Sequence, residues 1–214
     1  MRTRPRAAAG FTLVEMLVVI AIIGVLAGLI LVGVRAARRS AARSACEARI
    51  QALKSALQTY ANDFGDYPPT SLAGLSRSPG KNEGIESLIH CLTTRQGESS
   101  PYFEPEKDEL GNTDGDAQAR NVADSRLGGA ECLELLDPWG NPFVYYHHRD
   151  LKPVAGPAWA RLQVYVKGDG QSAKTQPRPD DRTKSYPGET SYQLWSFGPN
   201  GENEDGAGDD VRSW

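Results

Sequence analysis

The chain has 214 residues, a length typical of one domain, with 24 Lys and Arg, 27 Asp and Glu, and a formal net charge of −3. This slightly acidic balance excludes a general nucleic-acid-binding protein, and three cysteines are too few for a disulfide-stapled scaffold. The first 54 residues hold nine of the basic residues but only two of the acidic ones. A basic, apolar N-terminus is therefore joined to an acidic remainder.

Residues 11–34 form an almost uninterrupted apolar stretch, FTLVEMLVVIAIIGVLAGLILVGV, in which Glu15 is the one charged residue. As a helix, this stretch is about 36 Å long, enough to cross a hydrocarbon layer of about 30 Å. It is longer than the apolar region of a secretory signal peptide, which has roughly 7–15 residues. A carboxylate inside a membrane costs roughly 2.5–3.5 kcal/mol, so Glu15 indicates a partner within the membrane.

The start of this stretch resembles the processing site of type IV pilins and pseudopilins. The resemblance is carried by a basic leader, the run GFTLVE at residues 10–15, and the apolar residues that follow. It implies that a prepilin peptidase removes residues 1–10 by cutting after Gly10, and that the new N-terminal Phe11 is N-methylated. It also implies that Glu15 acts in assembly, where its carboxylate can pair with the Phe11 amine of a neighbouring subunit.

The helical pattern continues through residues 35–62, which are rich in alanine and contain no proline. Apolar residues recur there at spacings of three and four, as on one helical face: Ala42, Cys46, Ile50, Leu53, Leu57, Tyr60 and Ala61. We therefore predict one helix from about Thr12 to Asn62, with a transmembrane half at 11–34 and an amphipathic half at 35–62.

Residues 63–214 are expected to form a globular head, which begins with Gly and Pro residues that end the long helix. A short helix is predicted at 84–92, and the polar residues 97–131 have the character of a loop-rich insertion. Segments rich in aromatic and β-branched residues predict three antiparallel strands, at 143–148, 160–166 and 191–197, with a polar loop at 168–189. The predicted fold class is α+β and pilin-like: a long N-terminal helix packed against a small antiparallel β-sheet, with a C-terminal loop at 196–214.

The runs DPWGNP at 137–142 and SFGPNG at 196–201 narrow the resemblance to the major pseudopilin of type II secretion systems. On composition alone, the five acids near the C-terminus favour a solvated acidic tail over a Ca²⁺ site. Because the family binds one Ca²⁺ in this loop, the resemblance implies a calcium site whose candidate ligands are the Phe197 carbonyl, Asn200, Asp205, Asp209 and Asp210. Asn200 stands where the family has an aspartate, so it supplies an amide oxygen without charge.

Two other groups of polar residues are interpreted as structural. His147 and His148 fall in a predicted strand, where neighbouring side chains face opposite sides, so they are not expected to share a metal ion. Asp114 and Asp116, with Asp108 nearby, are expected to be solvated loop acids rather than a second cation-binding loop.

Cys91 and Cys132 are a candidate disulfide pair across the insertion, because the implied compartment is oxidising. Cys46 is then expected to be a small buried residue of the long helix. The sequence contains no nucleophile–base pair, phosphate-binding loop or zinc-type spacing, so no enzymatic activity is predicted.

We predict a structural pseudopilin subunit, anchored by a single pass in the bacterial inner membrane with its N-terminus cytoplasmic and its head periplasmic. The implied partners are further copies of itself in a periplasmic filament, the prepilin peptidase, minor pseudopilins, the inner-membrane assembly platform and membrane lipid, but no nucleic acid. One alternative is a type IV pilin for adhesion, motility or DNA uptake, which the lack of any cysteine after Cys132 disfavours. The other is a membrane-anchored binding module or enzyme, for which the segment 70–132 is the only support.

Overall fold

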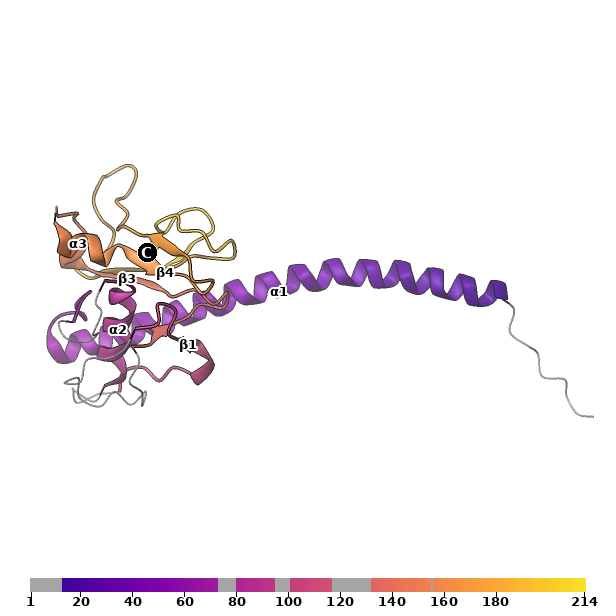
Figure 1. Ribbon diagram of the computed structural model, residues 1–214, viewed down its shortest axis with the longest axis horizontal. Helices are drawn as coiled ribbons and strands as arrows, with labels where there is room; N and C mark the ends of the chain where they lie inside the picture. The colour runs from indigo at the N-terminus through magenta and orange to yellow at the C-terminus, as the bar shows by residue number, and fades with distance from the viewer. Residues whose placement is uncertain (1–12, 73–79, 95–100, 117–131, 155) are drawn as a thin grey trace, which may run out of the picture. The chain divides into compact units, whose positions relative to one another are not determined.

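The computed structural model describes residues 13–72, 80–94, 101–116, 132–154 and 156–214 (Figure 1). One long helix, α1 (Leu13–Phe64), passes through two parts of the chain, residues 1–41 and a compact unit from Ala42 to Trp214. The two parts are described separately. The compact unit begins inside α1 because the second half of this helix contributes to its core.

The end of α1 is set by a glycine. The helix continues to Phe64 rather than ending near Asn62, and Gly65 then adopts a φ of 77° and donates its N–H to the Ala61 carbonyl at 2.8 Å. A glycine in the left-handed conformation is a common way for a helix to end. The predicted long helix is therefore confirmed, with a slightly later boundary.

One face of α1 within the compact unit is buried in the hydrophobic core. The residues on this face are at most 8% exposed and are Cys46, Ile50, Leu53, Leu57 and Tyr60. The Cys46 thiol is in hydrogen-bond contact with Ser196, and Tyr60 is in similar contact with Cys91. The amphipathic half of α1 thus packs against segments that lie more than thirty residues away in the chain, as its spacing predicted.

The central sheet has three antiparallel strands in the order β3 (Val144–His147), β6 (Tyr192–Ser196) and β7 (Val211–Arg212). Val144 pairs with Trp195, and Trp195 pairs with Arg212 on its other side. Every residue of β3 is buried, and Figure 1 shows this strand between α2 and α3. The Tyr146 ring stacks on the Trp195 ring at 5.8 Å between centroids, so aromatic side chains fill the centre of the head.

The remaining elements are short. β1 (Leu110–Gly111) pairs with β2 (Glu134–Leu135), and β4 (Val164–Val166) pairs with β5 (Ser172–Lys174). The helix predicted at 84–92 is confirmed as α2 (Glu83–Thr93), which is buried along its length and contacts β2 and β3. The other helices are the 3₁₀ turns η1 (Lys107–Glu109) and η2 (His148–Asp150) and the α-helix α3 (Pro157–Leu162).

The strand predicted at 160–166 is wrong in its first half and in its place in the sheet. Residues 157–162 are helical because Pro157 occupies the first turn, where its missing N–H costs nothing. The remainder, β4, pairs with β5, a strand inside the segment that was predicted to be a loop. The third strand of the central sheet is instead β7, from the predicted C-terminal loop.

Gly84 allows α2 to lie close to β3. A Cβ atom at this position would lie 2.3 Å from the Tyr145 carbonyl oxygen and 2.4 Å from the Tyr165 hydroxyl. Such distances are far below van der Waals contact, so the helix and the strand can approach this closely only if residue 84 has no side chain.

We expect Gly84→Ala to destabilise the head by at least about 1–3 kcal/mol, the usual cost of overpacking a core. The measurement is chemical unfolding of the full-length protein in detergent, followed by tryptophan fluorescence, because all four tryptophans lie in the head. Gly33→Ala is the matched control, since nothing lies within 4 Å of its added Cβ. Equal stability of the two variants would contradict the close approach at Gly84.

Candidate functional site

The N-terminal site is described only in part. Gly10 and Phe11, the predicted processing residues, lie outside the described residues. Glu15 lies in the first turn of α1, and the large apolar side chains from Leu13 to Leu26 are exposed. Among the helices of the described part of the chain, α1 alone is long and apolar enough to cross a membrane. An apolar surface of this size requires lipid or neighbouring helices to cover it.

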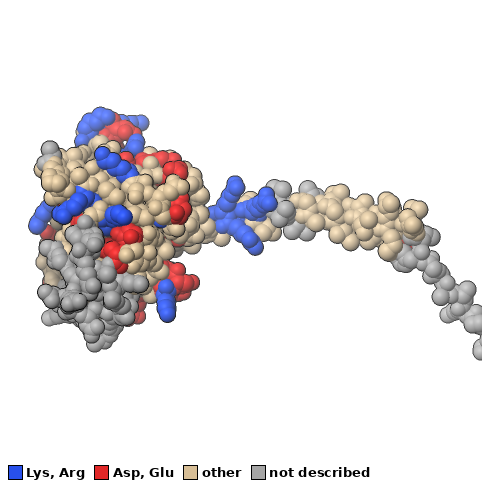
Figure 2. Space-filling view, in the orientation of Figure 1, with Lys and Arg blue, Asp and Glu red and all other residues tan. Residues whose placement is uncertain are grey.

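Basic side chains follow directly after the apolar stretch. Figure 2 shows Lys and Arg side chains gathered on this segment of α1. Arg35, Arg38 and Arg39 are exposed there. Basic residues at the end of a membrane span are attracted to anionic lipid headgroups by about 1 kcal/mol each, so this position fits a membrane surface.

The C-terminal loop folds back so that its two ends meet. Gly198 has a φ of 67°, and a Cβ there would lie 2.5 Å from the Asp209 carbonyl oxygen. The Asn200 backbone N–H donates to Asp209 Oδ2 at 3.1 Å, and its side-chain Nδ2 donates to Asp209 Oδ1 at 2.5 Å. The structure thus brings together two of the predicted ligands, Asn200 and Asp209.

Glu204 also belongs to this group, although the sequence analysis did not single it out. Its Oε1 accepts a hydrogen bond from Asn200 Nδ2 at 3.0 Å, and its backbone N–H donates to Asp210 Oδ2 at 3.1 Å. Asp205 faces another way, since its Oδ1 accepts from the Gln176 backbone N–H at 2.9 Å. The one available signal for Glu204 was its place in the acidic run, which does not reveal how the loop folds back.

Two carboxylate oxygens of the loop are buried without a hydrogen-bond partner, Asp210 Oδ1 and Glu204 Oε2. Burial raises the pKa of Asp210 to about 7; backbone N–H groups oppose this shift, and the nearby Glu204 carboxyl adds to it. Carboxylate oxygens are ligands that Ca²⁺ prefers, so Glu204, Asp209 and Asp210 fit a calcium ion. Asn200 Oδ1 instead accepts from the Glu202 backbone N–H at 2.6 Å while its Nδ2 faces the carboxylates, so Asn200 supplies a ligand only if its side-chain amide turns over. Phe197, whose carbonyl is the fifth predicted ligand, is buried directly after β6.

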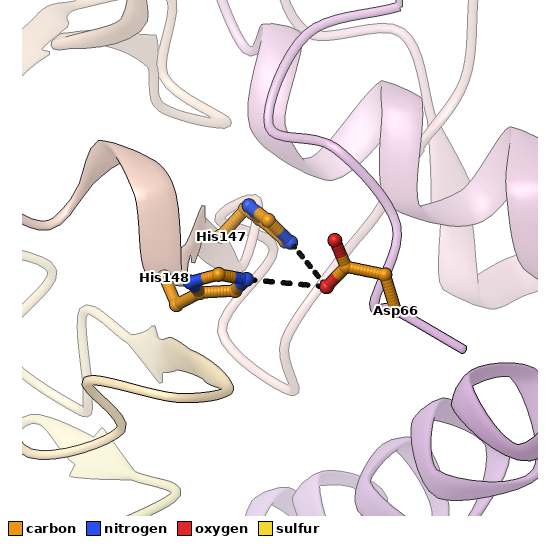
Figure 3. A group of neighbouring side chains, drawn as sticks. All are labelled: Asp66, His147 and His148. Carbon is orange, nitrogen blue, oxygen red and sulfur yellow. Dashed lines mark hydrogen bonds and ion pairs between the residues drawn. The ribbon is translucent and has the colours of Figure 1, made fainter. Parts of the chain in front are cut away.

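A second polar group ties the end of α1 to the end of β3 (Figure 3). Asp66 Oδ1 lies 3.0 Å from His147 Nε2 and 3.1 Å from His148 Nε2, and Asp66 Oδ2 accepts from Arg149 Nη2 at 2.6 Å. The expectation that the two histidines face opposite sides is wrong. Strand β3 ends at His147 and η2 begins at His148, so the alternation of a strand does not apply.

The electrostatics of this group follow from its contacts. Burial alone raises the pKa of Asp66, but hydrogen bonds from His147, the Tyr67 N–H and His148 outweigh it and lower the pKa to about 2. Burial lowers the pKa of His147, which favours its neutral form. A metal site requires ligand atoms close together, and Asp66, His147 and His148 each offer one within 4.8 Å of the others. The side chains of both histidines, however, are already hydrogen-bonded to Asp66.

A third group consists of acids around α2, and two of them, Asp114 and Asp116, were expected to be solvated. Asp114 and Asp116 are partly buried beside Glu86 and Glu134, while Asp108 is exposed and apart from them. Burial raises the pKa of Glu86 to about 10, with the neighbouring acids adding to the shift, and raises that of Glu134 to about 7. The interpretation of Asp114 and Asp116 as solvated loop acids is therefore wrong.

The candidate disulfide is absent. None of the three cysteines, all of which lie in described residues, is disulfide-bonded, and all are buried. Cys91 contacts Tyr60 and Ser87 within the core, whereas Cys132 lies beside Glu86 and Asp116 at the acidic group. The two thiols thus belong to different environments, while Cys46 is buried on α1 as predicted.

We expect Asp66→Asn to lower the stability of the head by about 1 kcal/mol at pH 5, where the carboxylate is charged. The folded pKa lies below the ordinary value of 3.8, so the contribution of Asp66 is present above about pH 4 and is lost as the pH falls towards 2. Unfolding at stepwise lower pH should therefore show the variant and the wild type converging. Asp181→Asn is the control, because Asp181 pairs with Arg178 at the surface and is 79% exposed. A difference that stays constant down to pH 2 would contradict the assigned contacts.

Comparison with known proteins identifies both the N-terminal motif and relatives of the head. Residues 5–31 match the model of the prokaryotic N-terminal methylation motif. The chain is 38% identical to type II secretion system core protein G of Escherichia coli K12 over 84 residues, which are 39% of this chain and 50% of that protein.

Two longer matches extend the similarity. The chain is 29% identical to core protein G of Pseudomonas aeruginosa over 140 residues, 65% of this chain and 74% of that protein. It is also 29% identical to core protein G of Aeromonas hydrophila over 138 residues, 64% of this chain and 72% of that protein. No solved structure matches at a comparable level. The chain thus combines a pilin-like α+β fold with an N-terminal methylation motif, and it is similar in sequence to the core protein G of type II secretion systems.

Proposed function

We propose that the chain is the major pseudopilin subunit of a type II secretion system and has a structural rather than an enzymatic role. The observation that carries this proposal is continuity along the chain. The methylation motif leads directly into the apolar half of α1, and similarity to core protein G covers 140 residues in the longest match. A motif alone would fit any pilin-like protein, whereas similarity over this length favours the secretion system.

In this role the basic leader lies in the cytoplasm, and prepilin peptidase cuts between Gly10 and Phe11 and methylates the new amine. The apolar half of α1 holds the subunit in the inner membrane, with Arg35, Arg38 and Arg39 at the lipid headgroups of the opposite surface. The head then lies in the periplasm, where minor pseudopilins and the assembly platform are its partners besides further copies of the chain.

The filament is held together by the apolar halves of neighbouring helices. Glu15 of one subunit pairs with the methylated amine of Phe11 on another, which offsets the cost of both charges in an apolar surrounding. The pair also fixes the axial register of the two helices. Loss of one partner of a buried ion pair costs about 3–5 kcal/mol, since the other charge then has no counterpart.

We expect Glu15→Ala to enter the membrane normally but to abolish or strongly reduce filament formation. The measurement is membrane fractionation together with electron microscopy of filaments from cells that overproduce the secretion system. Glu47→Ala is the control, because Glu47 is an exposed acid of the same helix that pairs only with Arg43 four residues away. Normal filaments from the Glu15 variant would contradict the pairing.

The C-terminal loop binds one Ca²⁺ through Glu204, Asp209 and Asp210, with the Phe197 carbonyl as a further ligand. Asn200 joins them once its side-chain amide turns over, so that its oxygen rather than its NH2 group faces the carboxylates. A cation there would neutralise acids that otherwise repel one another, and would satisfy the buried oxygens of Glu204 and Asp210. Asp205 is left out of this ligand set because its carboxylate is bonded to the Gln176 N–H. The ion thereby stiffens a loop that closes on β7.

We expect Ca²⁺ to raise the melting temperature of the full-length protein in detergent, and we expect the Asp209→Asn/Asp210→Asn double variant to lose most of that rise. Asp205→Asn is the matched control: it removes a backbone contact and lowers the baseline stability, but it keeps the calcium response. An identical response of the double variant and the wild type would rule out this loop as a calcium site.

The type IV pilin is the second candidate function, and the methylation motif fits it equally well. The acidic C-terminal loop and the similarity to core protein G favour secretion. Complementation separates the two: restoration of enzyme secretion in a strain that lacks its own core protein G supports the pseudopilin, and restoration of surface pili without secretion supports the pilin.

A further inference from the structure

We propose that the head contains a second divalent-cation site, selective for Ca²⁺, formed by Glu86, Asp114 and Glu134 with Asp116 beside them. The site is separate from the C-terminal loop, because none of its residues belongs to that loop. We refer to these four residues as the α2 acidic cluster.

Three elements bring the cluster together. Glu86 lies on α2, Glu134 begins β2, and Asp114 and Asp116 lie in the turn that follows β1. Each residue of the triad Glu86, Asp114 and Glu134 offers a carboxylate oxygen within 4.8 Å of the other two. The antiparallel pairing of β1 with β2 and the packing of α2 on β2 hold the three elements in place.

Neutral groups fix the orientation of Glu134. Its Oε1 accepts from Asn82 Nδ2 at 2.7 Å, and its Oε2 accepts from the Thr113 backbone N–H at 3.0 Å. Asn82 in turn accepts from the Val166 N–H at 2.8 Å, so β4 supports the same network. Glu134 is completely buried, and these contacts hold its carboxylate in one orientation without supplying a positive charge.

Glu86 is the residue that indicates a ligand. Its side chain is 2% exposed, and its Oε1 is buried with no hydrogen-bond partner. No ion pair in the described part of the chain involves Glu86, Asp114 or Glu134. Among the described residues, the exposed Lys81 influences Asp114. A buried oxygen without a partner is costly, and a bound cation would remove that cost.

The chemistry of the cluster favours a hard cation. Its ligand atoms are carboxylate oxygens, and Ca²⁺ takes about six to eight oxygens in flexible geometries. Asn112 Oδ1 orders the turn that carries Asp114 and Asp116 by accepting from the Gly115 and Asp116 N–H groups at 2.8 and 3.1 Å. Cys132 lies beside Glu86 and Asp116, so Zn²⁺ bound through its sulfur is the alternative that the test distinguishes.

The test uses calcium titration and thermal melting of the full-length protein in detergent after chelator treatment. The starting variant is Asp209→Asn/Asp210→Asn, which removes the proposed ion of the C-terminal loop. We expect this variant to bind one equivalent of Ca²⁺ and to melt at a higher temperature with it. Adding Glu86→Gln should abolish both effects, yet leave the melting temperature in chelator nearly unchanged, because a neutral amide of the same shape replaces the carboxyl.

Asp114→Asn in the same background is the second variant and should also lose the calcium effect, so that the result does not depend on the folding of Glu86→Gln. Asp108→Asn is the matched control, because Asp108 is an exposed acid of the same segment outside the cluster. It should keep one equivalent.

Several results would overturn the assignment. The starting variant would show no calcium binding if the cluster holds no cation. Unchanged binding after both Glu86→Gln and Asp114→Asn would place the ion elsewhere. Binding of Zn²⁺ but not Ca²⁺, lost in Cys132→Ser, would replace the oxygen site by a sulfur site. If the α2 acidic cluster binds Ca²⁺ but the C-terminal loop does not, the wild type and the starting variant bind the same single equivalent. Failure of the loop site can therefore be distinguished from failure of the cluster site.

Discussion

The head depends on the burial of one face of α1. This face provides the apolar surface on which α2 and the central sheet can pack, and it consists of Cys46, Ile50, Leu53, Leu57 and Tyr60. In the described part of the chain this sheet has three strands of four, five and two residues, and so small a sheet depends on packing against a helix for its stability. Because the same helix continues into the apolar half at its N-terminal end, the element that builds the core of the head is also long and apolar enough to cross a membrane.

The polar groups of the head lie where its segments join. Asp66 connects the end of α1 to the end of β3, and the C-terminal loop closes beside β7. The α2 acidic cluster lies where α2, β2 and the turn after β1 meet. Histidine and arginine side chains face the carboxylate of Asp66. The C-terminal loop and the α2 acidic cluster instead each gather several acids, some of whose buried oxygens have no hydrogen-bond partner. Cations at the latter two places would explain why a small domain tolerates so many acids in its interior.

The sequence predicted those features that depend on local pattern. The spacing of apolar residues located the buried face of α1, and the run of apolar residues located its membrane half, because both are properties of a single helix. It also predicted all of β3 and β6, and α2 except for its first and last residues. It missed a local hairpin, since β4 pairs with β5 across one short turn rather than with the central sheet. It also failed where distant contacts decide the outcome, since His147 and His148 converge on Asp66. The sequence could not predict that Glu204 and Glu86 belong to groups of acids. Glu204 reaches its partner because the C-terminal loop turns back on itself, and Glu86 meets its partners because distant segments fold together.

The measurement that tests the account most directly is hydrogen exchange along α1 in the full-length protein in detergent. If the second half of α1 is the core of the head, the amides from Cys46 to Tyr60 should exchange as slowly as those of β3 and β6, through global unfolding of the head. Amides at Arg35 to Arg39, which lie outside the compact unit, should exchange faster. Fast exchange from Cys46 to Tyr60 while β3 and β6 stay protected would show that the head is stable without the helix, and would contradict the account.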